Sequence, residues 1–96
     1  MIASFGDKTS EDIFNGISSK NARKFPNTLL SAACRKLDLI NAARTLDDLK
    51  APPQNRLKAL KGDLRGYYGI RVNDQFRIIF KMIQSNAHDV TIIDYH

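Results

Sequence analysis

The sequence contains one cysteine and no long apolar run, and each shortage excludes a class of protein. Cys34 has no second cysteine to pair with, so a domain stapled by internal disulfides is excluded. No apolar run approaches the roughly 20 residues that cross a membrane, and residues 1–10 lack the charged and apolar regions of a signal peptide. We therefore expect a cytoplasmic protein, with no membrane contact and with Cys34 as a buried, reduced thiol in a helix.

Signatures of several enzyme classes are also missing from the sequence. The cysteine and histidine residues do not have zinc-site spacing, and the glycines fit neither a phosphate-binding P-loop nor a dinucleotide-binding turn. No arrangement of serine, histidine and aspartate indicates a hydrolase triad. We expect neither a metal nor an organic cofactor.

Size and charge indicate a small basic domain. The 96 residues suffice for one hydrophobic core, so we expect a single domain over residues 1–96. Hydrophobic residues make up 43% and charged residues 26% of the chain, which is typical of globular proteins. Fifteen basic residues against ten acidic ones give a net charge of +5, which favours a polyanionic partner.

The first half of the chain has mainly helical patterns. Residues 1–5, MIASF, predict a short first strand, and a short helix follows, with Thr9 or Ser10 as its N-cap and Gly16 at its end.

A longer helix is predicted from Asn27 or Thr28, as its cap, to about residue 43. Its apolar positions recur at the helical period and form one stripe: Leu29, Leu30, Ala33, Leu37 and Ile40. The charged residues on its other faces are expected to be solvated: Arg35, Lys36 and Asp38. A short helical turn at TLDDLK adds Leu46 and Leu49 to the core.

The second half of the chain predicts strands. Pro52 and Pro53 end the helical half because proline cannot continue a helix. Four later segments have strand character: 56–62, 67–72, 76–83 and 89–96. We therefore expect an α+β fold, in which an N-terminal strand and two to three helices pack on one face of a mainly antiparallel sheet and leave its other face available. His88 is expected in a loop before the last strand.

The hairpin between the middle strands can be registered from parity. Apolar partners must share a face, so Ile70 pairs with Ile78 across a loop of residues 73–75, in which Asn or Asp adopts a left-handed backbone. This register places Arg71 opposite Arg77. Facing arginines repel unless an acid or a bound phosphate lies between them, and both alternatives remain open. The same face carries Lys81 and Tyr67, whereas Tyr68 lies on the other face.

Three stretches, LKGDLRGYYGIRV, VNDQFRIIF and IIDYH, together resemble the HigB-like toxins of the RelE/ParE superfamily of type II toxin–antitoxin systems. The resemblance covers nearly the whole chain, since MIASF and the amphipathic helices also fit. It implies a RelE-like fold and an mRNA endonuclease that cuts codons in the ribosomal A site without a metal. It also implies a helix-turn-helix antitoxin, HigA-like, through which alone the toxin would reach operator DNA.

The resemblance also implies the site residues. The basic position of LKGD falls on Lys61, the hairpin arginine on Arg77, and the closing triad on Asp94, Tyr95 and His96. Some relatives have a histidine where this chain has a lysine, at position 58.

Metal-free cleavage by the ribose 2′-OH needs proton transfer and stabilisation of a doubly charged phosphorane. Lys61 and Arg77 suit the stabilisation, because fixed cations can bind the developing negative charge. His96 is the candidate general acid, because imidazole exchanges a proton near neutral pH, and Asp94 could orient its ring.

The remaining candidates concern RNA binding. Tyr95 could stack on an unpaired base or could be a core tyrosine. A wider positive surface toward RNA phosphates would come from Arg56, Lys58 and Arg71. Two other functions fit the same fold: a ParE-like gyrase poison and a non-catalytic RNA-binding or corepressor module.

Overall fold

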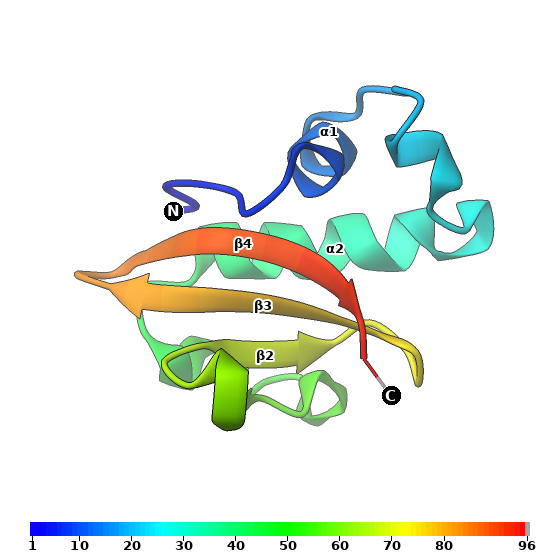
Figure 1. Cartoon of the computed structure of the whole chain (residues 1–96). Helices are drawn as coiled ribbons and strands as arrows, with labels where there is room; N and C mark the ends of the chain where they lie inside the picture. Colours follow the sequence, from blue (N-terminus) through cyan, green and yellow to red (C-terminus); the bar gives the residue numbers. More distant parts are fainter. Residues whose placement is uncertain (96) are drawn as a thin grey trace.

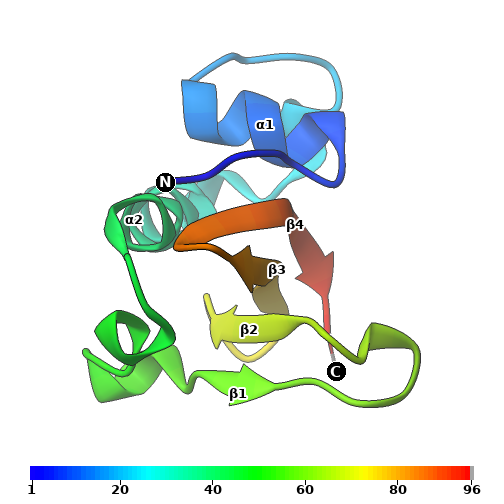
Figure 2. The same ribbon diagram turned by 90° about the vertical axis from the view of Figure 1, so that its left-hand side faces the viewer.

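The computed structural model describes residues 1–95 and has two layers, with helices over one face of an antiparallel sheet (Figure 1). The two α-helices are α1 (Lys8–Asn15) and α2 (Leu30–Ala42). The strands are β1 (Lys58–Ala59), β2 (Tyr68–Arg71), β3 (Phe76–Ile83) and β4 (Asn86–Asp94), in the order β1-β2-β3-β4. Figure 2 shows β1 and β2 at the end of the sheet away from α1. The predicted α+β architecture is confirmed.

The core lies between α2 and the sheet. On α2, Ala33, Leu37 and Ile40 are fully buried, as the apolar stripe predicts. They belong to one cluster with the buried face of the sheet, which includes Ile70, Val72, Ile78, Phe80, Ala87 and Val90. Leu49 also reaches the core, from the short 3-10 helix Leu46–Leu49. Within residues 1–95, no helix is both long and apolar enough to span a membrane.

The N-cap of α1 differs from the prediction. Asp7, not Thr9 or Ser10, caps the helix and accepts a hydrogen bond from the Ser10 backbone N–H at 2.8 Å. Ser10 is instead fully buried, and its hydroxyl accepts a hydrogen bond from the backbone N–H of Ile92 in β4 at 2.9 Å. Gly16 ends the helix in a left-handed conformation (φ 72°), as predicted.

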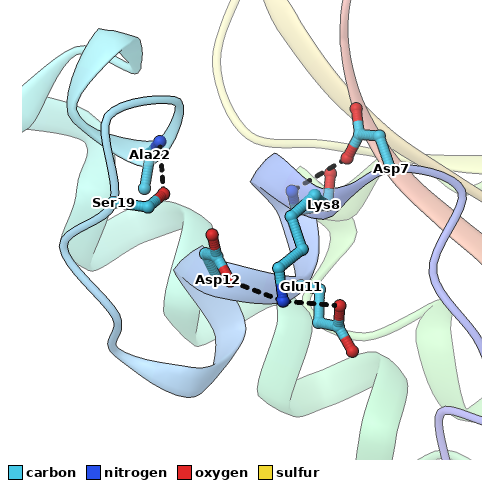
Figure 3. A network of polar contacts seen from close by, with 7 residues as sticks. Asp7, Lys8, Glu11, Asp12, Ser19 and Ala22 are labelled. Atoms are coloured by element: carbon cyan, nitrogen blue, oxygen red, sulfur yellow. Dashed lines mark hydrogen bonds and ion pairs between the residues drawn. The ribbon is translucent and has the colours of Figure 1, made fainter.

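The exposed side of α1 carries a small ionic network (Figure 3). Lys8 Nζ lies 3.4 Å from a carboxylate oxygen of Glu11 and 3.4 Å from one of Asp12. Asp12 is buried, so Lys8 supplies the counter-charge at the surface end of an otherwise covered carboxylate.

The start of α2 also differs from the prediction. Residues Asn27–Leu29 form a 3-10 turn, and the backbone N–H of Leu29 donates to the carbonyl of Pro26 at 3.0 Å. Backbone groups thus begin the helix where a side-chain cap was expected.

Within α2, Cys34 is half-buried. Its Sγ lies 3.6 Å from the carbonyl oxygen of Ile13, and burial raises the pKa of its thiol.

The N-terminal segment lies along β4 but is not a continuous strand. Asp89 has a left-handed backbone (φ 54°) at a bulge in β4, and its N–H donates to the Ser4 hydroxyl at 2.9 Å. A side chain therefore takes the place of a ladder carbonyl, and only isolated parallel bridges form, Ile2 with Ala87 and Phe5 with Val90. A Cβ on Gly6 would lie 2.0 Å from Thr91 Oγ1, so this close approach requires glycine.

Two strand boundaries correct the prediction. β1 has two residues instead of the predicted 56–62, because Arg56 is left-handed (φ 48°) and residues Gly62–Leu64 turn into a 3-10 helix. β4 begins at Asn86, so His88 lies in the strand opposite Lys81 and not in a loop. The preceding turn has two left-handed residues, Gln84 and Ser85, where a sequence would usually show glycine.

The β2–β3 hairpin has the predicted register, with Ile70 opposite Ile78 and Arg71 opposite Arg77. The prediction of a left-handed loop residue is wrong, since none occurs within residues 73–75. The Asn73 side chain closes the loop instead, because its Oδ1 accepts hydrogen bonds from the backbone N–H groups of Gln75 (3.0 Å) and Phe76 (2.7 Å).

Lys36 is buried, contrary to its predicted place on a solvated face. Only 8% of the residue is exposed, and its Nζ donates to Asn55 Oδ1. Asn55 is fully buried and donates in turn to the carbonyls of Leu49 (3.1 Å) and Ala51 (3.3 Å). This chain of bonds ties α2 to the segment that leads into β1. The helical period did predict the exposure of its neighbours Arg35 and Asp38.

Candidate functional site

Tyr95 lies on the open face of the sheet and not in the core. Its backbone N–H donates to the carbonyl of Gln75 at 2.6 Å, which holds the residues after β4 against the β2–β3 hairpin. Arg77 pairs with Ile93, so Tyr95, two residues further on, shares the face of Arg77. Lys58 Nζ and Arg77 Cζ each lie 5.1 Å from the centroid of the half-buried Tyr95 ring.

The segment 58–61 and the Tyr95 ring line an open groove of about 380 Å³. Lys61 is exposed at the end of this segment, where the extended chain turns into the 3-10 helix Gly62–Leu64. We call Lys58, Lys61, Arg77 and Tyr95 the cationic face. The structure therefore brings together four of the site residues that the sequence predicted.

Arg77 has no acidic partner within the described residues. It forms no salt bridge there, and its Nη1 is buried without a hydrogen-bond partner among residues 1–95. Its charge rests on the π-face of Tyr95, a contact that attracts a cation without neutralising it. A guanidinium in this setting favours an anionic ligand, since phosphate oxygens match its fork of donors.

Arg71, by contrast, is already paired. Its guanidinium donates to the carboxylate of Asp74 in the hairpin loop. This hydrogen bond and the charge of Arg71 lower the pKa of Asp74, and the charge of exposed Arg56 adds to the effect. The two facing arginines thus differ: an acid partly neutralises Arg71, whereas no acidic residue within positions 1–95 forms a salt bridge with Arg77. Arg71 pairs with Arg77 across β2 and β3, and neither Arg71 nor Arg56 belongs to the residues that line the groove.

Asp94, the last residue of β4, lies on the opposite face of the sheet from Arg77. It pairs with Phe76, whose side chain points to the helix layer, so Asp94 and Arg77 have opposite parity. Its Oδ2 accepts a hydrogen bond from Gln75 Nε2 at 3.0 Å. His96 lies outside the described residues, so the proposed contact between its ring and Asp94 stays a prediction.

Gln75 is a site residue that sequence reasoning missed. Its side chain binds Asp94 and its carbonyl binds the backbone of Tyr95, so one hairpin residue positions both. The available signal was its place in VNDQF, two residues before Arg77. Parity could place the loop but could not show that the end of β4 passes beside it.

Comparison with solved structures shows the fold. Two solved structures of the YoeB–YefM complex from Staphylococcus aureus contain a chain that aligns with all of this chain and with 98% of its own length, at a TM-score of 0.61 and 14% identity. At this level of identity the similarity concerns the fold alone.

Comparison of sequences shows the family. Toxin HigB-1 of Vibrio cholerae is 38% identical over 96 residues, which cover 100% of this chain and 98% of the relative. An uncharacterised protein of Haemophilus influenzae is 38% identical over 73 residues, which cover 76% of this chain and 71% of that protein. The family described as RelE-like toxin of the type II toxin–antitoxin system HigB matches residues 3–96. The chain therefore belongs to the HigB-like toxin family of type II toxin–antitoxin systems.

Proposed function

We propose that this toxin is a ribosome-dependent mRNA endonuclease that acts in the cytoplasm as a single domain. The observation that carries the proposal is the contact of the Tyr95 ring with both Lys58 and Arg77, beside the open groove that Tyr95 lines together with Lys61. Three cations and an aromatic ring on one exposed face suit a single-stranded RNA, whose phosphates bind cations and whose unpaired bases stack on aromatic rings.

In the proposed reaction a general base accepts the proton of the ribose 2′-OH, and the 2′-oxygen attacks the adjacent phosphorus. The P–O5′ bond then breaks, which leaves a 2′,3′-cyclic phosphate and a 5′-hydroxyl. Arg77 and Lys61 stabilise the charge that develops on the phosphorane oxygens. Tyr95 stacks on a base and orients the nucleotide that is cut, while His96 donates the proton that the departing 5′-oxygen needs.

The ribosome supplies what this sparse face lacks. In-line attack requires the 2′-oxygen, the phosphorus and the leaving oxygen to be aligned, and holding that geometry contributes much of the rate in such reactions. The A site of a translating ribosome presents mRNA in a fixed conformation. We therefore propose ribosome-bound mRNA as the substrate, rather than free RNA.

A helix-turn-helix antitoxin of the HigA type is the proposed protein partner. The support is membership in a family of type II toxin–antitoxin systems, together with a shared fold in solved complexes of toxin with antitoxin. Operator DNA is then contacted by the antitoxin, and the toxin reaches it only within the complex.

The decisive experiment is primer extension on an mRNA in a purified translation system, with the same mRNA free of ribosomes as the comparison. We expect cuts within codons on ribosomes and little cutting of free RNA. Equal cutting of both would overturn ribosome dependence. Intact mRNA with altered DNA topology would identify a gyrase poison, and RNA binding without cleavage on ribosomes would identify a non-catalytic module.

The role of His96 is tested in the same assay with His96→Gln. Glutamine keeps a polar side chain of similar reach but cannot exchange a proton near neutral pH. We expect severely reduced cleavage with an unchanged thermal unfolding midpoint. Cleavage at the wild-type rate would exclude His96 as the general acid.

A further inference from the structure

A second aromatic–cation pair lies on the open face of the sheet, apart from the cationic face. Lys81 Nζ lies 5.0 Å from the centroid of the Tyr67 ring. Tyr67 is half-buried, and 40% of the Lys81 side chain is exposed. The pair therefore presents a ring and an ammonium group to solvent, as Tyr95 and its two cations do.

An apolar floor lies between the two aromatic positions. Ile79, between Arg77 and Lys81 along β3, is buried on this face, and so is Leu60. Both side chains cover Gly69, since a Cβ there would lie 3.6 Å from Leu60 Cδ1 and 3.7 Å from Ile79 Cγ2. The open face therefore has an apolar centre with a positively charged ring site at each end.

The spacing of the two sites suits a nucleic acid strand. Arg77 and Lys81 are four residues apart on β3, or about 13 Å at a rise of about 3.3 Å per residue. A stacked strand advances about 3.4 Å per nucleotide, so both sites would hold one stacked RNA at nucleotides about four positions apart. An extended strand advances further per nucleotide, which brings the separation down to about two or three positions.

The charges on this end of the face leave Lys81 available to a phosphate. Its acidic neighbour is Asp89, at 3.8 Å, and the Asp89 side chain is 46% exposed. Exposed ion pairs of this length are weak. Stacking of a base on a tyrosine is stronger than an exposed cation–π contact, so an arriving base can displace the ammonium group toward a phosphate.

We propose that Tyr67 and Lys81 form a second nucleotide-binding subsite for the mRNA, in which Tyr67 stacks on a base about two to four nucleotides from the cut and Lys81 binds a neighbouring phosphate. The inference rests on the proposed endonuclease function, because it takes the cationic face as the site of cleavage. It adds a contact that would make the toxin sensitive to nucleotides outside the one that is cut.

The test measures binding of fluorescent single-stranded RNA octamers to the isolated toxin at low salt by anisotropy. A set of octamers carries one abasic nucleotide at each position in turn. We expect Tyr67→Leu to weaken binding of the intact octamer about tenfold, a usual loss for one stacked base, and Tyr67→Phe to bind within about twofold of wild type. At one position, the abasic nucleotide should weaken binding to the wild-type toxin about as much as Tyr67→Leu does. The same abasic octamer should bind Tyr67→Leu no more weakly than the intact octamer does.

Lys81→Gln should weaken every octamer and lower the salt dependence, because it removes a phosphate contact. The matched control is Lys50→Gln, an exposed lysine paired with Asp47 that should leave binding unchanged. Thermal unfolding of each variant reports on the fold. Rescue by Tyr67→Phe separates a ring that binds RNA from a side chain that merely fills space.

The outcomes separate the two proposals. The subsite would be overturned if Tyr67→Leu bound the intact octamer as tightly as wild type does. It would also be overturned if every abasic octamer lost the same affinity in wild type and in Tyr67→Leu. Either result would hold even if ribosomal cleavage occurs. The same holds if the wild-type toxin does not bind the octamers. Loss of the abasic effect in Tyr67→Leu, together with intact mRNA on ribosomes, would support the subsite and overturn the endonuclease.

Discussion

At the scale of single residues, Tyr95 determines how its neighbouring cations can act. Lys58 and Arg77 each lie 5.1 Å from the centroid of the Tyr95 ring, whose negative π-face attracts a cation without neutralising its charge. An acidic residue in the same place would also hold the cations, but it would repel a phosphate. An aromatic ring is thus a suitable support for a site that binds an anion.

Arg77→Ala and Lys61→Ala are each expected to lower ribosome-dependent cleavage by about 10²–10³-fold, the usual effect of removing one preorganised charge. Lys61 is exposed, so its replacement should change the free energy of unfolding by less than about 0.5 kcal/mol. Primer extension measures cleavage and urea unfolding measures stability. Wild-type cleavage by both variants would show that the cationic face is incidental, and unfolding of Arg77→Ala would show that the arginine is structural.

Lys36 is a residue whose charge state should affect stability. Burial lowers its pKa first, and the charges of Arg35 and Arg71 lower it further. The unfolded chain therefore binds more protons between the folded and unfolded pKa values, and the contribution of Lys36 to stability rises with pH through that window.

Relative to Lys36→Met, which cannot titrate, the wild-type protein should gain stability as the pH rises toward the ordinary pKa of lysine. Urea unfolding at a series of pH values measures the difference, and Lys20→Met provides an exposed control. Parallel pH profiles for wild type and Lys36→Met would contradict the prediction.

At the scale of elements, the sequence predicts what local periodicity and parity control. The apolar stripe of α2 and the register of the β2–β3 hairpin are both confirmed. The register was predictable because a one-residue slip would turn Ile70 and Ile78 away from the core. The burial of Lys36 could not be predicted, since its partner Asn55 lies 19 residues away. The bulge in β4 lies where Asp89 bonds to Ser4 of the N-terminal segment, and the sequence pattern within β4 cannot predict that contact.

The position of some candidate site residues was predictable for the same reason. The hairpin register placed Arg77 on the open face, whereas Lys61 was a candidate only through the family resemblance of LKGD. The contact of Tyr95 with two cations depends on how the end of β4 meets β1, from which it is separated by two strands in the sheet. Neither parity nor spacing in the sequence describes that meeting.

The hairpin loop offers a test at this scale. Asn73→Ala removes the acceptor for two backbone N–H groups, so we expect a loss of about 1–2 kcal/mol in unfolding free energy. Asn73→Asp keeps the acceptor oxygen and should retain most of the stability. Chemical denaturation compares the three proteins, and equal stability of Asn73→Ala would show that the loop does not need the side chain.

At the scale of the whole molecule, the net charge of +5 matters through its distribution. Within residues 1–95, no salt bridge involves the three cations of the cationic face, whereas Arg71 is paired with Asp74. Single-stranded RNA binding should therefore weaken with salt. The log–log slope should be about −2.8, since these three cations and Lys81 of the second subsite would each contribute about −0.7.

Asp74→Asn should make that slope steeper by about 0.7, because it releases Arg71 to bind a further phosphate. Anisotropy titrations between about 50 and 200 mM salt measure both slopes. Identical slopes for wild type and Asp74→Asn would place Arg71 outside the RNA-binding surface.

The contact between the first residues and β4 also has a consequence for how the chain folds. The bonds from Ile92 to Ser10 and from Asp89 to Ser4 join residues 82 and 85 positions apart, whereas the β2–β3 hairpin closes over three residues. Closing the longer loop costs more entropy, so we expect the hairpin to form first and the N-terminal segment to dock late.

Ser10→Ala should then accelerate unfolding and leave the refolding rate nearly unchanged, which stopped-flow kinetics can measure; a slowed refolding rate would instead place this contact in the folding nucleus. During synthesis, α1 also has to wait for its partner, because β4 is made last. At about 5–20 residues per second, α1 waits roughly 4 to 16 s for the strand that buries its serine.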